Sequence, residues 1–244
     1  MLQNTRGIAL RAVKYGDTSI IATIFTELYG VQSYMVQGVR SSKAKNNKAA
    51  LLQPATLLDM VVYHKPNTKL QRIKEYQYAY IYTSLQEEII KNSVALFSAE
   101  VLLRILPEEA LMPELFQFAF QYFQQLDTMP ASNVANFPLY FLVQCSRILG
   151  YEISGTYSSE TPYLHMQDGA YTATPPKMDT YLHDEDAKAL SNILNIEDAM
   201  LLKMIALNSE TRNRLIDWYI EFMQSHTQHM GSIKSLTVLR AILH

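Results

Sequence analysis

The chain of 244 residues has very little cysteine and no long apolar segment. Its single cysteine, Cys145, excludes an intramolecular disulfide and any metal site built from several cysteines. No apolar run reaches the ~18 residues that a membrane-spanning helix needs. The first residues, 1–6, are not a basic start followed by an apolar stretch, so a signal peptide is not expected. We therefore expect a cytoplasmic protein with no membrane partner.

The sequence also lacks the short motifs that mark common active sites. It has no P-loop for phosphates, no glycine pattern of a dinucleotide site and no nucleophile elbow around a serine. The acidic run 184–186 precedes a helical segment, where acids stabilise the positive end of the helix dipole. A nuclease metal site there would need further ligands, which the sequence does not offer. We expect no enzymatic activity, no metal ion and no cofactor.

Charge is distributed unequally along the chain. Residues 1–80 contain eleven of the 21 lysines and arginines but only four of the 23 acids, a net charge of +7. Residues 81–244 carry −9, although the whole chain is close to neutral at −2. A basic segment attached to an acidic one indicates that the first segment binds a polyanion.

Apolar periodicity predicts short strands in the first eighty residues. Alternation begins at Ile8, and further strands are expected at 19–26, 31–36, 57–63 and 70–78. Five short strands with one long basic loop are typical of a small antiparallel barrel of the OB type. A barrel of the SH3 type has the same periodicity and is the structural alternative.

From residue 83 the apolar period becomes helical. Ser84 to Glu87 has the pattern of a capping box, which predicts the start of a first helix. Pro113 is expected to open a second helix. A third is expected to end at Gly150, since glycine favours the left-handed conformation that closes many helices.

The expected fold class is α+β, with an OB-type barrel followed by an all-α domain. The change of period places the domains at 1–80 and 81–244. Within the second domain, residues 151–181 are rich in Ser, Thr, Pro and Gly and form an irregular insertion. Asp168-Gly169 lies between two short β-like segments and predicts a hairpin there.

The polar loop between the third and fourth expected strands is the strongest local signal. Residues 40–48 contain four cations, with Ser and Asn between them and no acid. All four residue types donate to phosphate oxygens, and released counterions favour such contacts. Bases on nearby strands are expected to line the same groove, with tyrosines as stacking faces for nucleobases. The predicted nucleic-acid contacts are Arg11, Lys14, Tyr34, Arg40, Lys43, Lys45, Lys48, Lys65, Lys69, Arg72 and Lys74.

Several blocks of residues, taken in order, resemble the bacterial DNA repair protein RecO (recombination protein O) family. The blocks are Gly7 to Arg11, Tyr15-Gly16-Asp17, Phe25-Thr26, Tyr29-Gly30, Gly38 to Lys43, Leu52-Gln53-Pro54, Arg214-Leu215-Ile216, Trp218-Tyr219 and Lys234-Ser235-Leu236. The resemblance implies an OB-fold head, a helical body, binding to single- and double-stranded DNA, and annealing of complementary strands. It also implies that RecR and single-stranded DNA-binding protein (SSB) are partners in loading the RecA recombinase.

One departure from the family concerns zinc. Many members carry a four-cysteine zinc module after a Leu-Gly pair, whereas here Leu149-Gly150 is followed by a segment without cysteine. We therefore do not expect this chain to bind zinc in such a module.

A protein-binding site is expected on the acidic helical domain. The tail of SSB is acidic with an apolar end, so it needs a local patch that is basic and apolar. The predicted residues are Arg212, Arg214, Trp218 and Lys234. In the alternative interpretation, both arginines pair with acids such as Asp217 or Glu221 across helix turns.

The sequence thus predicts a non-enzymatic recombination mediator in DNA repair, cytoplasmic and associated with the nucleoid. An RNA-binding OB protein of translation or RNA processing is the alternative. A metal-dependent nuclease using Asp184, Glu185 and Asp186 is a third and weaker hypothesis.

Overall fold

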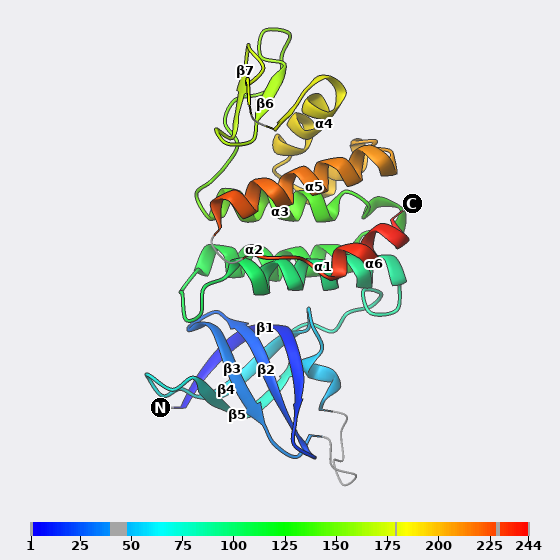
Figure 1. Cartoon of the computed structure of the whole chain (residues 1–244). Coiled ribbons are helices and arrows are strands. Elements are labelled where there is room, and N and C mark those ends of the chain that lie inside the picture. Colours follow the sequence, from blue (N-terminus) through cyan, green and yellow to red (C-terminus); the bar gives the residue numbers. More distant parts are fainter. Residues whose placement is uncertain (1, 40–47, 179, 228–229, 244) are drawn as a thin grey trace. The chain divides into compact units, whose positions relative to one another are not determined.

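The computed structural model of the protein describes residues 2–39, 48–178, 180–227 and 230–243 (Figure 1). The chain forms two compact units. The first comprises residues up to Glu87 together with Ala95–Thr128, and the second comprises Glu88–Val94 and the residues from Met129 onward. The change from strands to helices falls near residue 80, as the sequence predicts. Packing nevertheless groups most of the first helix and all of the second with the strands.

The strands of the first unit form a closed barrel. They are β1 (Leu2–Tyr15), β2 (Ser19–Thr26), β3 (Gly30–Val36), β4 (Leu57–Tyr63) and β5 (Leu70–Tyr78), with a short 3-10 helix, η1 (Ala50–Leu52), before β4. Their order is β1-β2-β3-β5-β4, and β4 pairs back with β1. β3 and β5 run parallel, and all other pairs are antiparallel. This Greek-key order is that of an OB fold, so the SH3-type alternative is wrong.

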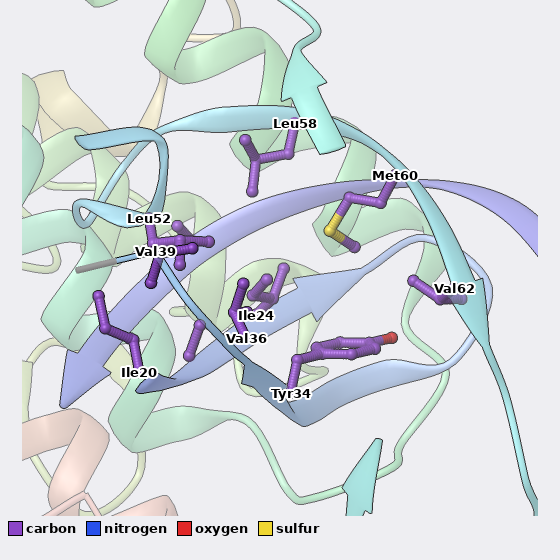
Figure 2. Packing of buried hydrophobic residues seen from close by; sticks show 11 residues of the cluster. Ile20, Ile24, Tyr34, Val36, Val39, Leu52, Leu58, Met60 and Val62 are labelled. Carbon is purple, nitrogen blue, oxygen red and sulfur yellow. The ribbon is translucent and has the colours of Figure 1, made fainter. Parts of the chain in front are cut away.

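Inward-facing side chains of all five strands fill the barrel. Figure 2 shows the ring of Tyr34 pointing from β3 toward Met60 and Val62 of β4. Each fully buried large apolar side chain contributes about 1.5–3 kcal/mol to the stability of the fold, because its apolar surface is removed from water. Gly7 is required at its position, because a Cβ there would lie 2.7 Å from Cγ2 of Ile24. The core is therefore tightly packed on the inner side of β1.

A register shift in β1 decides which side chains face outward. Ala9 pairs with Ile24 and Arg11 pairs with Thr23, so Leu10 has no partner on β2. The simple alternation that the sequence predicts for this strand is therefore interrupted. Ile8, Ala9 and Leu10 are all buried, and beyond the shift all five residues from Arg11 to Tyr15 are exposed. By their register, Arg11 and Val13 lie on the same face as Thr23 and Ile21 of β2.

The helices of the first unit cover one part of the barrel. The helices are α1 (Ile89–Ile105), which crosses the division between the units, and α2 (Pro113–Thr128). Phe116 of α2 packs edge-on against Phe25 of β2, with ring centroids 5.3 Å apart. The connection between α1 and α2 pairs with the start of β3, where Glu109 N donates to Val31 O at 3.2 Å. The strand ends near α2 are therefore unavailable to a ligand.

The segment that joins the barrel to the helices is held by one carboxylate. Asp127, at the end of α2, accepts hydrogen bonds from the backbone N–H groups of Thr83 (2.9 Å), Ser84 (2.8 Å) and Leu85 (2.7 Å). The predicted capping box is therefore wrong: α1 begins at Ile89, and Ser84 binds Asp127 instead of capping a helix.

The second unit is mainly helical. It contains η2 (Ala131–Asn133), α3 (Phe137–Ile148), β6 (Tyr163–His165), β7 (Ala170–Thr172), β8 (Tyr181–Leu182), α4 (Asp184–Leu194), η3 (Ala199–Met204), α5 (Ser209–His226) and α6 (Ser235–Ile242). The hairpin predicted around Asp168-Gly169 is confirmed as β6 and β7, and β8 adds a third strand beside β6. The helix end at Gly150 is also confirmed, with φ of +87°.

The hairpin is fixed by hydrogen bonds and aromatic packing. The Tyr171 hydroxyl donates to Ala187 O of α4 at 2.8 Å, and Ser154 N donates to Gly169 O at 2.8 Å. A Cβ on Gly169 would lie 3.0 Å from the Phe222 ring.

The residues present do not fit the family's zinc module, because the lone Cys145 is buried in α3 and no three potential ligands gather among the described residues. Among the described residues, no helix is both long enough and apolar enough to cross a membrane.

Candidate nucleic-acid interface

The solvent-facing side chains of β1, β2, β3 and β5 lie in rows across the barrel. In one row Val13 pairs with Ile21, Ile21 with Met35, and Met35 with Arg72. The next row is Arg11, Thr23, Ser33 and Leu70. We call the outer face the set Arg11, Val13, Tyr15, Ile21, Thr23, Ser33, Met35, Leu70 and Arg72. In OB folds, the corresponding face of strands 2 and 3 binds oligonucleotides.

The outer face combines apolar and aromatic surface with cations. Val13 is 44% exposed and Tyr15 is 52% exposed, which is unusual for residues of a regular strand pair. Arg11 and Arg72 are exposed on either side of them, at opposite margins of the face. Such a surface can contact both components of a nucleic-acid strand, because guanidinium groups bind phosphates and apolar faces stack with bases.

The arginines of the outer face differ from the others in what they bind. Six arginines elsewhere hold carboxylates or carbonyl oxygens of their own chain: Arg6, Arg104, Arg147, Arg212, Arg214 and Arg240. In the part of the chain that the structure describes, the guanidinium groups of Arg11 and Arg72 have no such partner. Their charges are therefore available to a ligand.

A small cavity lies beside the outer face, where β3 and β5 run parallel. Its volume is about 220 Å³, and its lining residues are Met35, Val36, Gln37, Val39, Lys48, Arg72, Ile73, Lys74 and Tyr76. The Tyr76 hydroxyl donates to Lys48 O at 3.2 Å, and Lys48 Nζ lies 5.8 Å from the centroid of the Tyr76 ring. Burial raises the pKa of Tyr76 to about 12, so this hydroxyl stays protonated and remains a donor.

A larger cavity on the barrel has a mixed electrostatic character. It measures about 640 Å³ and is lined by Glu27, Asp59 and Glu75 as well as by Arg6 and Lys48. Glu27 is bound by Arg6 at 2.7 Å, and its hydrogen bond to that guanidinium lowers the pKa of the carboxyl group. Three carboxylates repel a polyanion, so the smaller cavity is the better candidate for contact with DNA.

The remaining predicted DNA contacts are of three kinds. Lys65 and Lys69 are exposed in the turn between β4 and β5, and Lys14 is exposed at the end of β1. Lys74 is exposed at a register shift in β5 and pairs with Glu75 at 3.5 Å. The cluster that gave the strongest sequence signal, Arg40, Lys43 and Lys45, lies outside the described residues.

Tyr34 was wrongly predicted as a base-stacking residue. It is 0% exposed and belongs to the barrel core (Figure 2). The sequence could not reveal this, because tyrosines occur on both faces of half-buried strands. The apolar members of the outer face, Ile21 and Met35, were missed for the same reason, since the inward residues of β2 and β3 are equally apolar.

Two residues of the predicted protein-binding site are also buried and cannot contact a partner directly. Arg212 is 5% exposed and donates to Leu207 O at 2.9 Å and to Asn136 Oδ1 at 3.3 Å. Burial lowers the pKa of Arg212 from its ordinary value. Trp218 is likewise 5% exposed, and its ring stacks on Phe222 with centroids 5.6 Å apart. Both side chains stabilise the packing of α5.

The other two residues of that predicted site are exposed. Arg214 binds Asp186 of α4 at 2.8 Å and Glu210 of its own helix at 3.1 Å. The alternative prediction, that Arg214 pairs with an acid of its own helix, is therefore confirmed, but the acid is Glu210 and not Asp217 or Glu221. Lys234 is exposed immediately before α6.

Comparison with known families and proteins gives a consistent result over the whole chain. The family model "Recombination protein O N terminal" matches residues 1–82, and "Recombination protein O C terminal" matches residues 86–236. The DNA repair protein RecO of Bacteroides fragilis is 34% identical over 243 residues, and that of Phocaeicola vulgatus is 32% identical over 244 residues. The RecO protein of Christiangramia forsetii is 29% identical over 242 residues, and each alignment covers 99% of both chains. The chain therefore belongs to the recombination protein O family of DNA repair proteins.

Proposed function

We propose that this protein is a non-enzymatic recombination mediator. In this proposal the barrel binds single- and double-stranded DNA and anneals complementary strands. Together with RecR, the protein helps RecA to load onto DNA coated with SSB. Membership of a DNA repair family supports the general role, and the outer face of the barrel supports DNA as the ligand.

The observation that carries the proposal is the contrast among the arginines. Within the described ranges, Arg11 and Arg72 are left without acidic partners, while the other arginines bind carboxylates or carbonyls of the protein. Leaving two guanidinium groups unpaired on one face of a basic barrel gives no benefit to folding. It does give a surface that attracts phosphates at long range and binds them on contact.

This arrangement also suggests how annealing would proceed. Two complementary strands repel each other through their phosphates, and cations of the barrel and its turns reduce that repulsion when both strands bind. Contacts to phosphates do not depend on base identity, so any sequence can be held. Bases left free at the outer edge can then pair, and no bond is made or broken by the protein.

The second unit is proposed to bind proteins, because its acidic character disfavours DNA. Of the four residues first expected to form the SSB site, Arg214 and Lys234 are the exposed ones. We propose that the acidic tail of SSB contacts Lys234 and competes with Asp186 and Glu210 for Arg214. Exchange of Lys234→Glu should weaken capture of an SSB tail peptide and leave affinity for naked DNA unchanged. Equal capture by the variant would remove Lys234 from the site.

The central test measures how DNA affinity depends on salt. For single strands the slope of log affinity against log salt is about −0.7 per neutralised phosphate, so loss of one phosphate contact should reduce the magnitude of the slope by about 0.7. We expect this reduction for Arg11→Gln and for Arg72→Gln, together with slower annealing. Lys188→Gln, an exposed cation on α4, is the matched control.

Two outcomes would contradict the proposal. Salt-independent binding by the wild type would exclude an electrostatic interface. Loss of DNA affinity in the Lys188→Gln control, with no loss in the Arg11 and Arg72 variants, would show that DNA binds outside the barrel. An RNA strand of the same sequence, used as competitor, should displace the DNA no better than unlabelled DNA does.

A further inference from the structure

We propose that the small cavity between β3 and β5 holds one unpaired base of a DNA single strand, and that this contact makes the barrel prefer single strands to duplex. The proposal rests on the proposed function, since it assigns a specific role to one part of the DNA-binding surface. It concerns the cavity of about 220 Å³ that Tyr76 and three cations line.

The shape and lining of the cavity suit a flat, partly apolar group. Met35 lies opposite Arg72 in the parallel pair, and Val36 and Ile73 form apolar wall on either side. The volume corresponds to about seven water molecules at roughly 30 Å³ each, which leaves room for a single pyrimidine base. Tyr76 is held in place by its hydrogen bond to Lys48 O and adds an aromatic wall.

Charge at the rim suits the phosphates on either side of such a base. Lys48, Arg72 and Lys74 line the cavity, and none of the lining residues is an acid. The larger cavity on the same barrel has three carboxylates in its lining and so repels a phosphate. A base in the small cavity would therefore leave its neighbouring phosphates beside cations.

Selectivity follows from the access that each form of DNA gives to its bases. In a duplex the bases are paired and stacked, and a base must be unstacked and unpaired before it can enter a pocket. In a single strand that cost is small. Duplex DNA is therefore expected to use only the cations and the outer face, while single strands also use the cavity.

The first experiment fills the cavity in the full-length protein. Gln37 is exposed, follows β3 and lines the cavity, so Gln37→Phe adds bulk with little risk to the fold. Gln77→Phe, on β5 at the larger cavity, is the matched control. The probes are an oligothymidine of about 16 nucleotides, within the span that one OB fold covers, and a blunt duplex of the same length.

We expect Gln37→Phe to weaken oligothymidine binding about 5- to 140-fold, the range of one lost base-stacking contact, and to leave duplex binding unchanged. Arg11→Gln should weaken both. Equal effects of Gln37→Phe on both forms, or no effect on either, would overturn the cavity assignment while leaving DNA binding by the barrel intact. Failure of the wild type to bind either form would instead overturn the proposed function.

The second experiment needs no variant. Oligothymidine carrying 5-iododeoxyuridine is photo-crosslinked to the wild-type protein, and the modified residues are identified by mass spectrometry. Crosslinks at Tyr76 or Met35 with the single strand, absent with the duplex, support the proposal. Crosslinks confined to Tyr15 and to residues of the outer face that do not line the cavity would overturn it.

Discussion

The carboxylate of Asp127 allows a quantitative prediction about how the barrel is attached to the helices. It is 1% exposed and accepts three backbone hydrogen bonds from Thr83, Ser84 and Leu85. Burial alone would raise the pKa of Asp127, but these N–H groups and the Thr83 hydroxyl outweigh it and hold the pKa at about 2. The ionised form is therefore the one that the fold stabilises.

The size of this effect follows from the shift in pKa. Relative to the ordinary value of 3.8, a pKa of about 2 corresponds to about 2–3 kcal/mol at 1.36 kcal/mol per unit. Asp127→Asn keeps the shape but removes the charge and turns an N–H donor toward the backbone N–H groups. We expect it to destabilise the protein by about 2–3 kcal/mol at neutral pH, which lowers the melting temperature by roughly 5–10 °C.

The pH dependence has a definite direction. Because the pKa is lower in the folded protein than in the unfolded chain, the stabilisation is complete above about pH 4 and is lost as the pH falls toward 2. Urea unfolding of wild type and Asp127→Asn at several pH values should show a difference that shrinks over this window. Asp198→Asn, which removes an exposed carboxylate bound to Met200 N, is the control. A difference for Asp127→Asn that stays constant with pH would refute the reasoning.

Three further predictions concern stability and metal content. A fragment of residues 1–128 should melt cooperatively in circular dichroism, whereas 1–82 should not, because Phe25 loses its contact with α2; identical melting curves would show that the barrel folds alone. Arg212→Met should cost about 2–4 kcal/mol in urea unfolding, since carbonyl groups lose their donor, while DNA affinity stays at the wild-type value. Elemental analysis should find no stoichiometric zinc, and a chelator should leave the melting temperature unchanged; one zinc per chain would contradict this.

Strands β2 to β5 could be predicted from the sequence almost to the residue, because each half-buried strand alternates over a few residues between turn signals. The first strand begins at Leu2, six residues before the predicted start at Ile8. The order of the strands could not be predicted, since the parallel pairing of β3 with β5 depends on contacts that are distant in sequence. The burial of Tyr34 could not be predicted either. Its neighbours along β3 do not show which face of the strand the helices and the other strands leave exposed.

The helical region shows a second limit of prediction from sequence. A helix start was expected at Ser84 from a local pattern, but a carboxylate more than forty positions away competes for the same backbone groups. Arg212 and Trp218 were expected at the surface because a cation beside an aromatic residue is typical of binding sites. In α5 both point into the packed side of the helix, where carbonyls at the ends of other segments receive the guanidinium.

The unpaired residue in β1 has a consequence for how this protein tolerates insertions and deletions. Leu10 adds one position to the strand without a partner on β2. Its deletion would keep every cation and every aromatic residue of the sequence, yet would exchange the inner and outer sets from Arg11 onward. Arg11, Val13 and Tyr15 would then take the inner register, and Ala12 and Lys14 would take the outer one. The length of this strand therefore decides which of its side chains join the outer face.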